Sequence, residues 1–304
     1  MKILVTGGNS FIGVHLLTEL KSQGHEVFGT IRSQHEKMPP VDVPIFVASL
    51  NEQAPWVDVM QKVRPDCVIH LAAVALVTHE DQAELYKTNV IGTEYVLKAI
   101  GEAPELKPHV ILASTAGVYG NQSRPLLDEA LEPKPANHYA LSKLAMEYLA
   151  RQYADLYPIR IIRPFNVVGP GQSDTFLVPK LVKHFMMNAD EIQLGNLKPE
   201  RDYIDVRDFV AVLSRLAQIV PPSLDIVNIC SGVGTSVAQV AEWLADMTGH
   251  HPTLTVSPKF VRKNEVWRMV GDNRKVLDLV KYQLRYSVRE ALEWMVRDAT
   301  RAQS

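Results

Sequence analysis

Tyr139 and Lys143 are four residues apart, a spacing that suggests proton-transfer chemistry. A helix predicted over residues 139–157 would place both side chains on one face. A free tyrosine has a pKa of about 10, and a neighbouring ammonium group lowers that pKa toward the range useful for proton transfer. Pairs with this spacing occur by chance in many helices, so the assignment depends on the motifs around it.

A glycine-rich loop opens the chain, because residues 7–13 (GGNSFIG) lie between a predicted strand over 2–6 and a predicted helix over 11–23. Backbone amides in such a turn point at a pyrophosphate, and the helix N-terminus adds partial positive charge. Gly7 allows the tight turn, and Gly13 lets the helix pack close to the strand. The order strand, loop, helix predicts a dinucleotide site, with an ordinary glycine turn as the alternative.

The elements that must position these residues alternate along the first half of the chain. We expect further strands over 26–31, 66–72, 110–114 and 159–163, and long helices over 80–101 and 139–157. This rhythm predicts an α/β fold with a doubly wound parallel sheet of the Rossmann type. We expect a dinucleotide-binding domain over 1–168, to which 205–230 returns with one more strand, and a smaller C-terminal lobe over 169–304.

Four ordered segments carry a resemblance to a known family. Residues 6–13 resemble the TGGxGFIG segment of the extended short-chain dehydrogenase/reductase family, and residues 114–120 (STAGVYG) resemble its strand end before the Tyr-Lys pair. Residues 70–73 (HLAA) and Asn89 with Gly92-Thr93 match two others, and for Asn89 and Gly92 we expect structural roles. The resemblance covers essentially the whole chain. Ser10 replaces a family glycine, and its Cβ would face the pyrophosphate and lower the affinity.

The resemblance implies a role for each matching residue. Tyr139 would exchange a proton with the substrate, Thr115 would hydrogen-bond the reacting oxygen, and Lys143 with the nicotinamide ring would favour the phenolate. The cofactor contacts that it implies are Gly7, Asn9, Ser10, Phe11, Ile12, Gly13, Leu50, Leu71, Ala72 and Ala73, together with Tyr139 and Lys143.

The segment after the second strand indicates which nicotinamide cofactor is used. Enzymes that use NAD place an acid there for the ribose hydroxyls, whereas residues 27–33 (VFGTIRS) contain no carboxylate. Arg32, Ser33 and Thr30 could instead hold a 2′-phosphate. A solvated surface arginine is the alternative reading of Arg32, but the missing acid favours NADP (NADPH).

The second half of the chain resembles the nucleotide-sugar branch of the family. Residues 163–172 (RPFNVVGPGQ), 194–208 and 228–232 match segments of sugar-nucleotide reductases and dehydratases. The resemblance implies a nucleotide-diphospho sugar as substrate and assigns to it Thr115, Asn166, Lys180, Arg201 and Arg262. Lys180 has a solvated surface role as its alternative, and the match at Arg262 lacks a proline that relatives carry. For Asp205 and Asp208 we expect structural roles.

The residues after Thr115 narrow the reaction. Family members that dehydrate the sugar carry an Asp-Glu pair there, whereas this chain has Ala116-Gly117, which disfavours a dehydratase. The resemblance implies NADPH-dependent reduction of the C4 ketone of a GDP-linked 4-keto-6-deoxy sugar. A C4 epimerase that retains NAD(P) is the alternative enzyme, and an NADP-sensing regulator is the alternative that is not an enzyme.

Bulk composition excludes several other classes. The net charge of −2 gives no basic surface for nucleic acid, and no apolar run approaches the roughly 20 residues of a membrane span. Cys67 and Cys230 lie in strand-like runs, so we expect two buried thiols, no metal site and a cytoplasmic enzyme.

Relatives pair two long helices into a four-helix bundle, which predicts a homodimer in which these apolar side chains supply the surface: Leu85, Val96, Leu97, Leu144 and Leu149. The alternative is that these residues face the chain's own sheet.

Overall fold

The computed structural model describes residues 1–76, 79–103, 105–261 and 265–303, which form two compact units. Unit 1 contains Met1–Gly120, Glu132–Pro164 and Val210–Asn228, and unit 2 contains Asn121–Leu131, Phe165–Phe209 and Ile229–Ser304. The segment 121–131, which we expected in the first domain, groups with unit 2.

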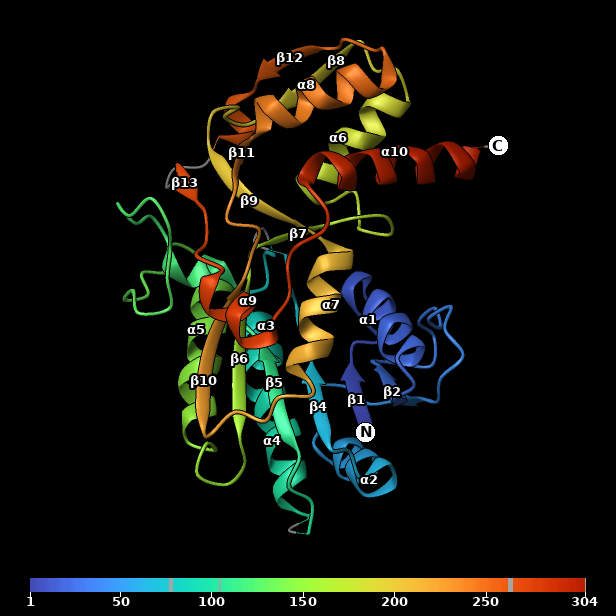
Figure 1. Cartoon of the computed structure of the whole chain (residues 1–304), viewed down its shortest axis with the longest axis vertical. Helices are drawn as coiled ribbons and strands as arrows, with labels where there is room; N and C mark the ends of the chain where they lie inside the picture. Colours follow the sequence, from blue (N-terminus) through green and yellow to red (C-terminus); the bar gives the residue numbers. More distant parts are fainter. Residues whose placement is uncertain (77–78, 104, 262–264, 304) are drawn as a thin grey trace. The chain divides into compact units, whose positions relative to one another are not determined.

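Unit 1 is built on a seven-stranded sheet with the strand order β10-β6-β5-β4-β1-β2-β3 (Figure 1). Neighbouring strands from β6 to β3 pair in parallel, which confirms the predicted α/β fold with a doubly wound sheet. Most of these strands are short apolar runs buried on both faces. The strands are β1 (Lys2–Thr6), β2 (Glu26–Ile31), β3 (Ile45–Val47), β4 (Cys67–His70), β5 (His109–Ala113), β6 (Ile159–Pro164) and β10 (Leu224–Ile229).

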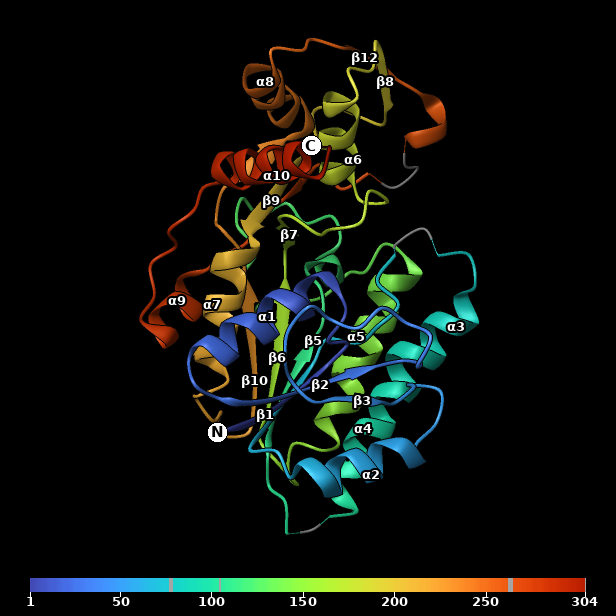
Figure 2. The same cartoon turned by 90° about the vertical axis from the view of Figure 1, so that its right-hand side faces the viewer.

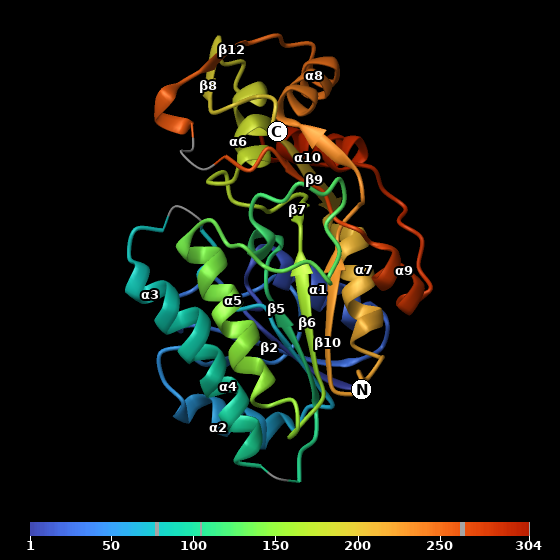
Figure 3. The same cartoon turned by 90° about the vertical axis from the view of Figure 1, so that its left-hand side faces the viewer.

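Helices cover both faces of this sheet (Figures 2 and 3). On one face α2, α4 and α5 share an apolar core with the strands, to which Trp56, Val96 and Met146 contribute. On the other face lie α1 and the part of α7 that belongs to unit 1, where Ser214 Oγ donates to Gln23 Oε1 at 2.5 Å. The helical elements are α1 (Phe11–Ser22), α2 (Ala54–Val63), α3 (Gln82–Tyr86), η1 (Lys87–Ile91), α4 (Gly92–Gly101), η2 (Ala116–Tyr119), α5 (His138–Arg151) and α7 (Val206–Leu216).

The direction of winding reverses between β1 and β4. From β1 the chain proceeds outward to β2 and β3, and then returns to build β4, β5 and β6 on the other side. Because the carboxyl ends of parallel strands meet at one edge, the residues after β1, β2, β4 and β5 all leave the sheet there. In open α/β sheets this reversal point is where a dinucleotide binds.

The stretch 80–101 differs from the single long helix that we expected. Asp81 caps α3, η1 is a π-helical turn, and α4 continues the same path. Gly92, the first residue of α4, leaves no room for a side chain, because a Cβ there would lie 2.6 Å from the Cβ of Leu50.

The expected dimer surface was partly wrong. Leu85, Val96 and Leu97 are at most 1% exposed, because they pack into unit 1 itself. Leu144 and Leu149 are half-buried on α5. Apolar periodicity marks the buried side of a helix but does not say whether its own chain or a partner buries it.

Unit 2 contains a small sheet in which β9 pairs with β7, β11 and β13. Helices α6, α8 and α10 enclose a separate apolar core that includes Leu181, Leu244 and Leu292. The elements are β7 (Asn166–Val168), α6 (Leu177–Met186), β8 (Glu191–Leu194), β9 (Glu200–Asp205), β11 (Gly234–Ser236), α8 (Val237–Thr248), β12 (Thr253–Val256), η3 (Pro258–Phe260), β13 (Arg268–Met269), α9 (Arg274–Val280) and α10 (Val288–Gln303).

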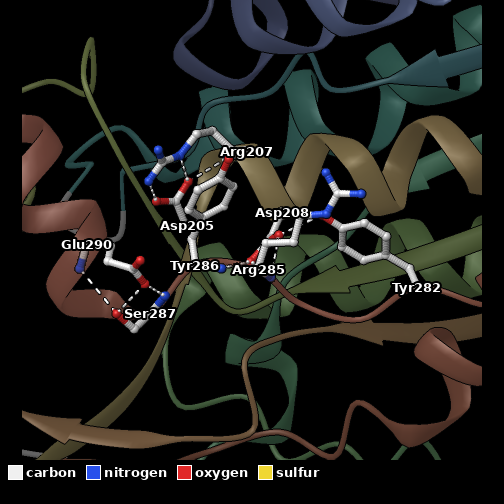
Figure 4. A network of polar contacts seen from close by, with 8 residues as sticks. All are labelled: Asp205, Arg207, Asp208, Tyr282, Arg285, Tyr286, Ser287 and Glu290. Atoms are coloured by element: carbon white, nitrogen blue, oxygen red, sulfur yellow. Dashed lines mark hydrogen bonds and ion pairs between the residues drawn. The ribbon is translucent and has the colours of Figure 1, made fainter.

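Figure 4 shows how the start of α7 is tied to the C-terminal segment within unit 2. Asp208 accepts hydrogen bonds from the Tyr282 hydroxyl at 2.7 Å and from the Arg285 and Tyr286 amides. Asp205 accepts two bonds from the Arg207 guanidinium, which stacks 3.5 Å from the Tyr286 ring centroid. Both aspartates are buried and accept from backbone amides, Asp205 from that of Arg207 at 2.8 Å, as the sequence analysis expected.

Two features of the described part of the chain concern membrane crossing and the cysteines. None of its helices combines the length and apolar character that a membrane crossing requires. Cys67 and Cys230 are both free and buried, which confirms the two predicted thiols. Burial raises the pKa of each thiol above its usual value.

Candidate active site

The catalytic candidates of unit 1 come from α5 and from the turn after β5. Asn137 caps α5 by accepting a hydrogen bond from the Ala140 amide at 2.9 Å, which fixes where the helix begins. Tyr139 therefore lies in the first turn, and Lys143 follows on the same side. Lys143 is 4% exposed, and its ammonium donates to the Ala113 carbonyl at the end of β5 at 2.8 Å.

Thr115 joins this pair. It caps η2, where its Oγ1 accepts from the Gly117 amide at 3.1 Å, and it also hydrogen-bonds the Tyr139 side chain. Gly117 leaves room for this arrangement, since a Cβ there would lie 3.3 Å from Thr115 Oγ1 and 3.4 Å from the Ala140 Cβ. The structure thus brings together Thr115, Tyr139 and Lys143.

Burial dominates the protonation of these groups. It raises the pKa of Tyr139 to about 12, and the Thr115 hydrogen bond partly opposes this shift. Burial also lowers the pKa of Lys143 to about 8, although the nearby Glu147 carboxylate raises it. The expectation that Lys143 lowers the pKa of Tyr139 is therefore not met in the protein alone, because desolvation disfavours the phenolate more strongly. Tyr139 is a protonated donor at neutral pH.

A buried ion pair between β6 and α5 stabilises the elements that carry the site. Arg163 donates to Glu147 at 3.0 and 2.7 Å, and both side chains are at most 2% exposed. Ser114 Oγ donates to the same carboxylate at 2.5 Å. Sequence reasoning did not find this pair, although Glu147 follows Lys143 by one helical turn and Arg163 stands in a recognised motif. The Glu147 carboxylate links Ser114, the residue before Thr115, to α5, the helix that carries Tyr139.

Asn89 bridges two elements of the site, as expected for a structural residue. Its side chain accepts from the Val74 amide at 2.9 Å and donates to Ser142 Oγ at 3.1 Å. Ser142 in turn donates to the Tyr139 carbonyl. The segment after β4 is thereby connected to α5.

The glycine loop has the geometry that a pyrophosphate requires. Gly7 has a φ of +69°, and a Cβ there would approach the Ala72 backbone to 3.1 Å. A Cβ on Gly13 would collide with the Gly7 carbonyl oxygen. The first turn of α1, at Phe11 and Ile12, presents amides that no helical carbonyl can reach. This cradle fits the pyrophosphate of a dinucleotide cofactor.

Ser10 also has a structural role, and its expected effect on pyrophosphate affinity stays a prediction. It caps α1, and its Oγ accepts from the Gly13 amide at 3.1 Å. The side chain is therefore engaged with its own helix. The hydroxyl stabilises the first turn of α1.

The end of β4 is tied to β1 beneath this cradle. Thr6 Oγ1 accepts from the Leu71 and Ala72 amides at 3.1 and 3.0 Å and lies 2.8 Å from His70 Nδ1. Burial lowers the pKa of His70 to about 3, so its ring is neutral at physiological pH. These contacts hold residues 71–73 beside Gly7. Leu50, also assigned to the cofactor, is buried against Gly92.

The residues after β2 differ in their exposure. Thr30 is 1% exposed, whereas the Arg32 side chain is 70% exposed and Ser33 is half-buried. Arg32 Nη2 lies 2.8 Å from Glu36 Oε1. An acid therefore does stand beside this strand end, although it was not found in residues 27–33. Because a tight turn brings Glu36 back to the strand end, no acid appears in the sequence directly after β2.

The substrate candidates of unit 2 lie on or near β7 and β9. Asn166 Nδ2 donates to the Asp202 carbonyl at 2.9 Å, and Arg201 pairs with Glu265 at 3.2 Å. Lys180 places its ammonium 4.7 Å from the Phe260 ring centroid. Arg262 lies outside the described residues. In the described part of the chain, no group of three or more His, Cys, Asp or Glu side chains is placed to hold a metal ion.

Comparisons with known proteins show what this chain is similar to. The NAD dependent epimerase/dehydratase family matches residues 3–230. A GDP-6-deoxy-D-talose 4-dehydrogenase of Aggregatibacter actinomycetemcomitans is 38% identical over 301 residues, which are 98% of each chain. A GDP-6-deoxy-D-mannose reductase of Pseudomonas aeruginosa is 27% identical and covers 98% of this chain and 96% of its own length. The solved structure of RMD from Pseudomonas aeruginosa with NADPH has a TM-score of 0.83 at 26% identity, with 98% of each chain covered.

The chain belongs to the NAD dependent epimerase/dehydratase family. It is an NAD(P)-dependent enzyme of the extended short-chain dehydrogenase/reductase type, in the branch that contains nucleotide-sugar enzymes. This confirms the family and branch indicated by the sequence motifs.

Proposed function

We propose that the chain reduces the C4 ketone of a GDP-linked 4-keto-6-deoxy sugar with NADPH. The observation that carries this proposal is the convergence of Thr115, just after the end of β5, with Tyr139 and Lys143 on α5, where the Lys143 ammonium donates to the Ala113 carbonyl at 2.8 Å. The buried Ala116 and the adjacent Gly117 offer no acid for elimination of water. The two relatives reported above are named for oxidation at C4 and for reduction of GDP-linked deoxy sugars, which supports the same carbon and the same nucleotide.

The side chains divide the chemistry of a ketone reduction. NADPH, held by the glycine loop of unit 1, supplies the hydride. Tyr139 donates its phenolic proton to the carbonyl oxygen, and Thr115 holds that oxygen by a hydrogen bond. Lys143, fixed at the Ala113 carbonyl, stabilises the phenolate that Tyr139 becomes. Asn166, Lys180, Arg201 and Arg262 remain candidates for binding the nucleotide sugar.

A panel of GDP-, UDP- and dTDP-linked 4-keto-6-deoxy sugars tests the reaction, with NADPH followed by its absorbance. We expect the largest kcat/KM for the GDP-linked ketone. Turnover of a UDP-linked 4-hydroxy sugar without net loss of NADPH would favour the epimerase. The absence of turnover of any sugar, together with NADP-dependent binding of another macromolecule, would favour the regulator. The intact trio Thr115, Tyr139 and Lys143 argues against the regulator.

The cofactor proposal predicts a selective effect of Arg32→Ala. Loss of one charge-assisted contact costs about 1.5–3 kcal/mol, which raises the dissociation constant for NADPH roughly tenfold to hundredfold. The dissociation constant for NADH should stay nearly unchanged, because NADH has no 2′-phosphate. Fluorescence titration measures both constants. Equal weakening of both cofactors would contradict the assignment of Arg32.

The homodimer remains a prediction, and the structure changes the residues that would carry it. Large apolar side chains are exposed on η1 at Ile91 and on α5 at Leu141 and Tyr148. We expect light scattering to give twice the chain mass of 34.0 kDa and Leu141→Asp to give the monomer. Leu156→Asp, at an exposed position outside α5, is the control. A monomeric wild-type chain at micromolar concentration would refute the dimer.

A further inference from the structure

The carboxylate of Glu36 is held by three donors near the end of β2. Arg32 contributes its Nη2 at 2.8 Å and its backbone amide at 3.0 Å. Asn9, in the glycine loop, donates through Nδ2 at 3.2 Å. Two of these groups are side chains that the sequence analysis assigned to the cofactor, but in this structure an internal acid engages both.

A tight turn brings Glu36 to this position. The Glu36 amide donates to the Ser33 carbonyl at 3.2 Å, which reverses the chain just after β2. The Glu36 side chain is 23% exposed, whereas that of Arg32 is 70% exposed. The carboxylate is therefore packed between the strand end and the glycine loop.

This location has a defined meaning in dinucleotide-binding sheets. The end of the second strand meets the adenosine ribose, where an acid accepts from its hydroxyls or an arginine holds a 2′-phosphate. Glu36 and Arg32 bring both solutions to one place. A 2′-phosphate and the Glu36 carboxylate are both anions, so they cannot share the same donors without repulsion.

We propose that Glu36 is a cofactor-specificity residue whose carboxylate takes the place of a 2′-phosphate at Arg32 and Asn9. With NADPH, the phosphate displaces Glu36 from Arg32. With NADH, Glu36 stays and accepts a hydrogen bond from the ribose. The proposal rests on the cofactor site of the proposed function, and it predicts that this one site binds either cofactor and prefers NADPH.

Glu36→Gln tests the proposal because glutamine keeps an oxygen for the Arg32 amide and removes only the charge. Since a partly exposed ion pair contributes about 0.2–1 kcal/mol, we expect the dissociation constant for NADPH to fall by up to about fivefold. The dissociation constant for NADH should rise about threefold to tenfold, because a neutral acceptor replaces a charged one. Both are measured on the full chain by nicotinamide fluorescence without sugar.

Glu26→Gln is the matched control. It removes the same charge from an exposed residue at the opposite end of β2, about 16–20 Å away along the strand. At that distance salt screens its charge from the cofactor, so both constants should stay within twofold of the wild type. In an Arg32→Ala background, Glu36→Gln should lower the dissociation constant for NADPH by less than twofold.

The proposal is supported if Glu36→Gln lowers the dissociation constant for NADPH and raises that for NADH, and if the effect on NADPH is lost in the Arg32→Ala background. Shifts of equal sign, no shift, or full tightening without Arg32 would overturn it. Because these titrations contain no sugar, they are independent of whether the enzyme reduces or epimerises its substrate. A failure of the C4 reduction would therefore leave this result interpretable.

Discussion

Tyr139→Phe should lower kcat by about 10²–10⁴, the usual contribution of a positioned general acid. The substitution removes the phenolic proton and keeps the ring that packs at the start of α5. The dissociation constants for NADPH and for the nucleotide sugar should barely move, because the hydroxyl acts mainly in the transition state. Single-turnover kinetics with the GDP-linked ketone, together with binding titrations, measure both quantities.

Two further variants control this experiment. Tyr148→Phe, on the same helix but 58% exposed, should leave kcat unchanged. Thr115→Val should resemble Tyr139→Phe with a smaller loss, because it removes one hydrogen bond and leaves the acid in place. A fully active Tyr139→Phe enzyme, free of host reductases, would show that Tyr139 is only a packing residue.

Arg163→Met should destabilise unit 1 by about 3–5 kcal/mol, because it leaves the Glu147 carboxylate buried without its cation. The pair is bidentate and almost completely shielded from water. Calorimetry should show the melting temperature falling by roughly 6–20 °C, at about 2–4 °C per kcal/mol for a domain of this size.

The surface pair Arg64–Glu105 provides the comparison. Its side chains are 53% and 51% exposed, so Arg64→Met should cost less than about 1 kcal/mol. Replacing both buried partners, in Arg163→Met with Glu147→Leu, should recover much of the lost stability. If Arg163→Met melts no lower than Arg64→Met, the buried pair does not stabilise the site.

Local signals explain how much of the site could be predicted. The glycine loop and the Tyr139, Lys143 and Thr115 trio lie within short segments, and parallel strands bring those segments to one edge of the sheet. Glu36 was missed because a turn returns it to a strand end that it does not follow directly. Arg163 and Glu147 were missed because only the sheet places β6 beside α5.

Other differences arise where one pattern has two physical outcomes. A serine in a glycine loop can also cap its own helix, as Ser10 caps α1. An apolar stripe packs on its own sheet or on a partner, and Leu85 and Val96 are covered within the chain. The pKa of Tyr139 combines burial with charge, and only the structure shows that burial dominates.

Deuterium transfer from the cofactor tests the proposed C4 reduction most directly. With NADPH deuterated at the transferring position of the nicotinamide and the GDP-linked 4-keto-6-deoxy sugar, we predict one deuterium at C4 of each product molecule. One NADP⁺ should form for every sugar reduced, and NMR of the product with the absorbance of the cofactor gives both values. Product that carries no deuterium at C4, formed while the NADPH absorbance stays constant, would contradict the reduction proposed here.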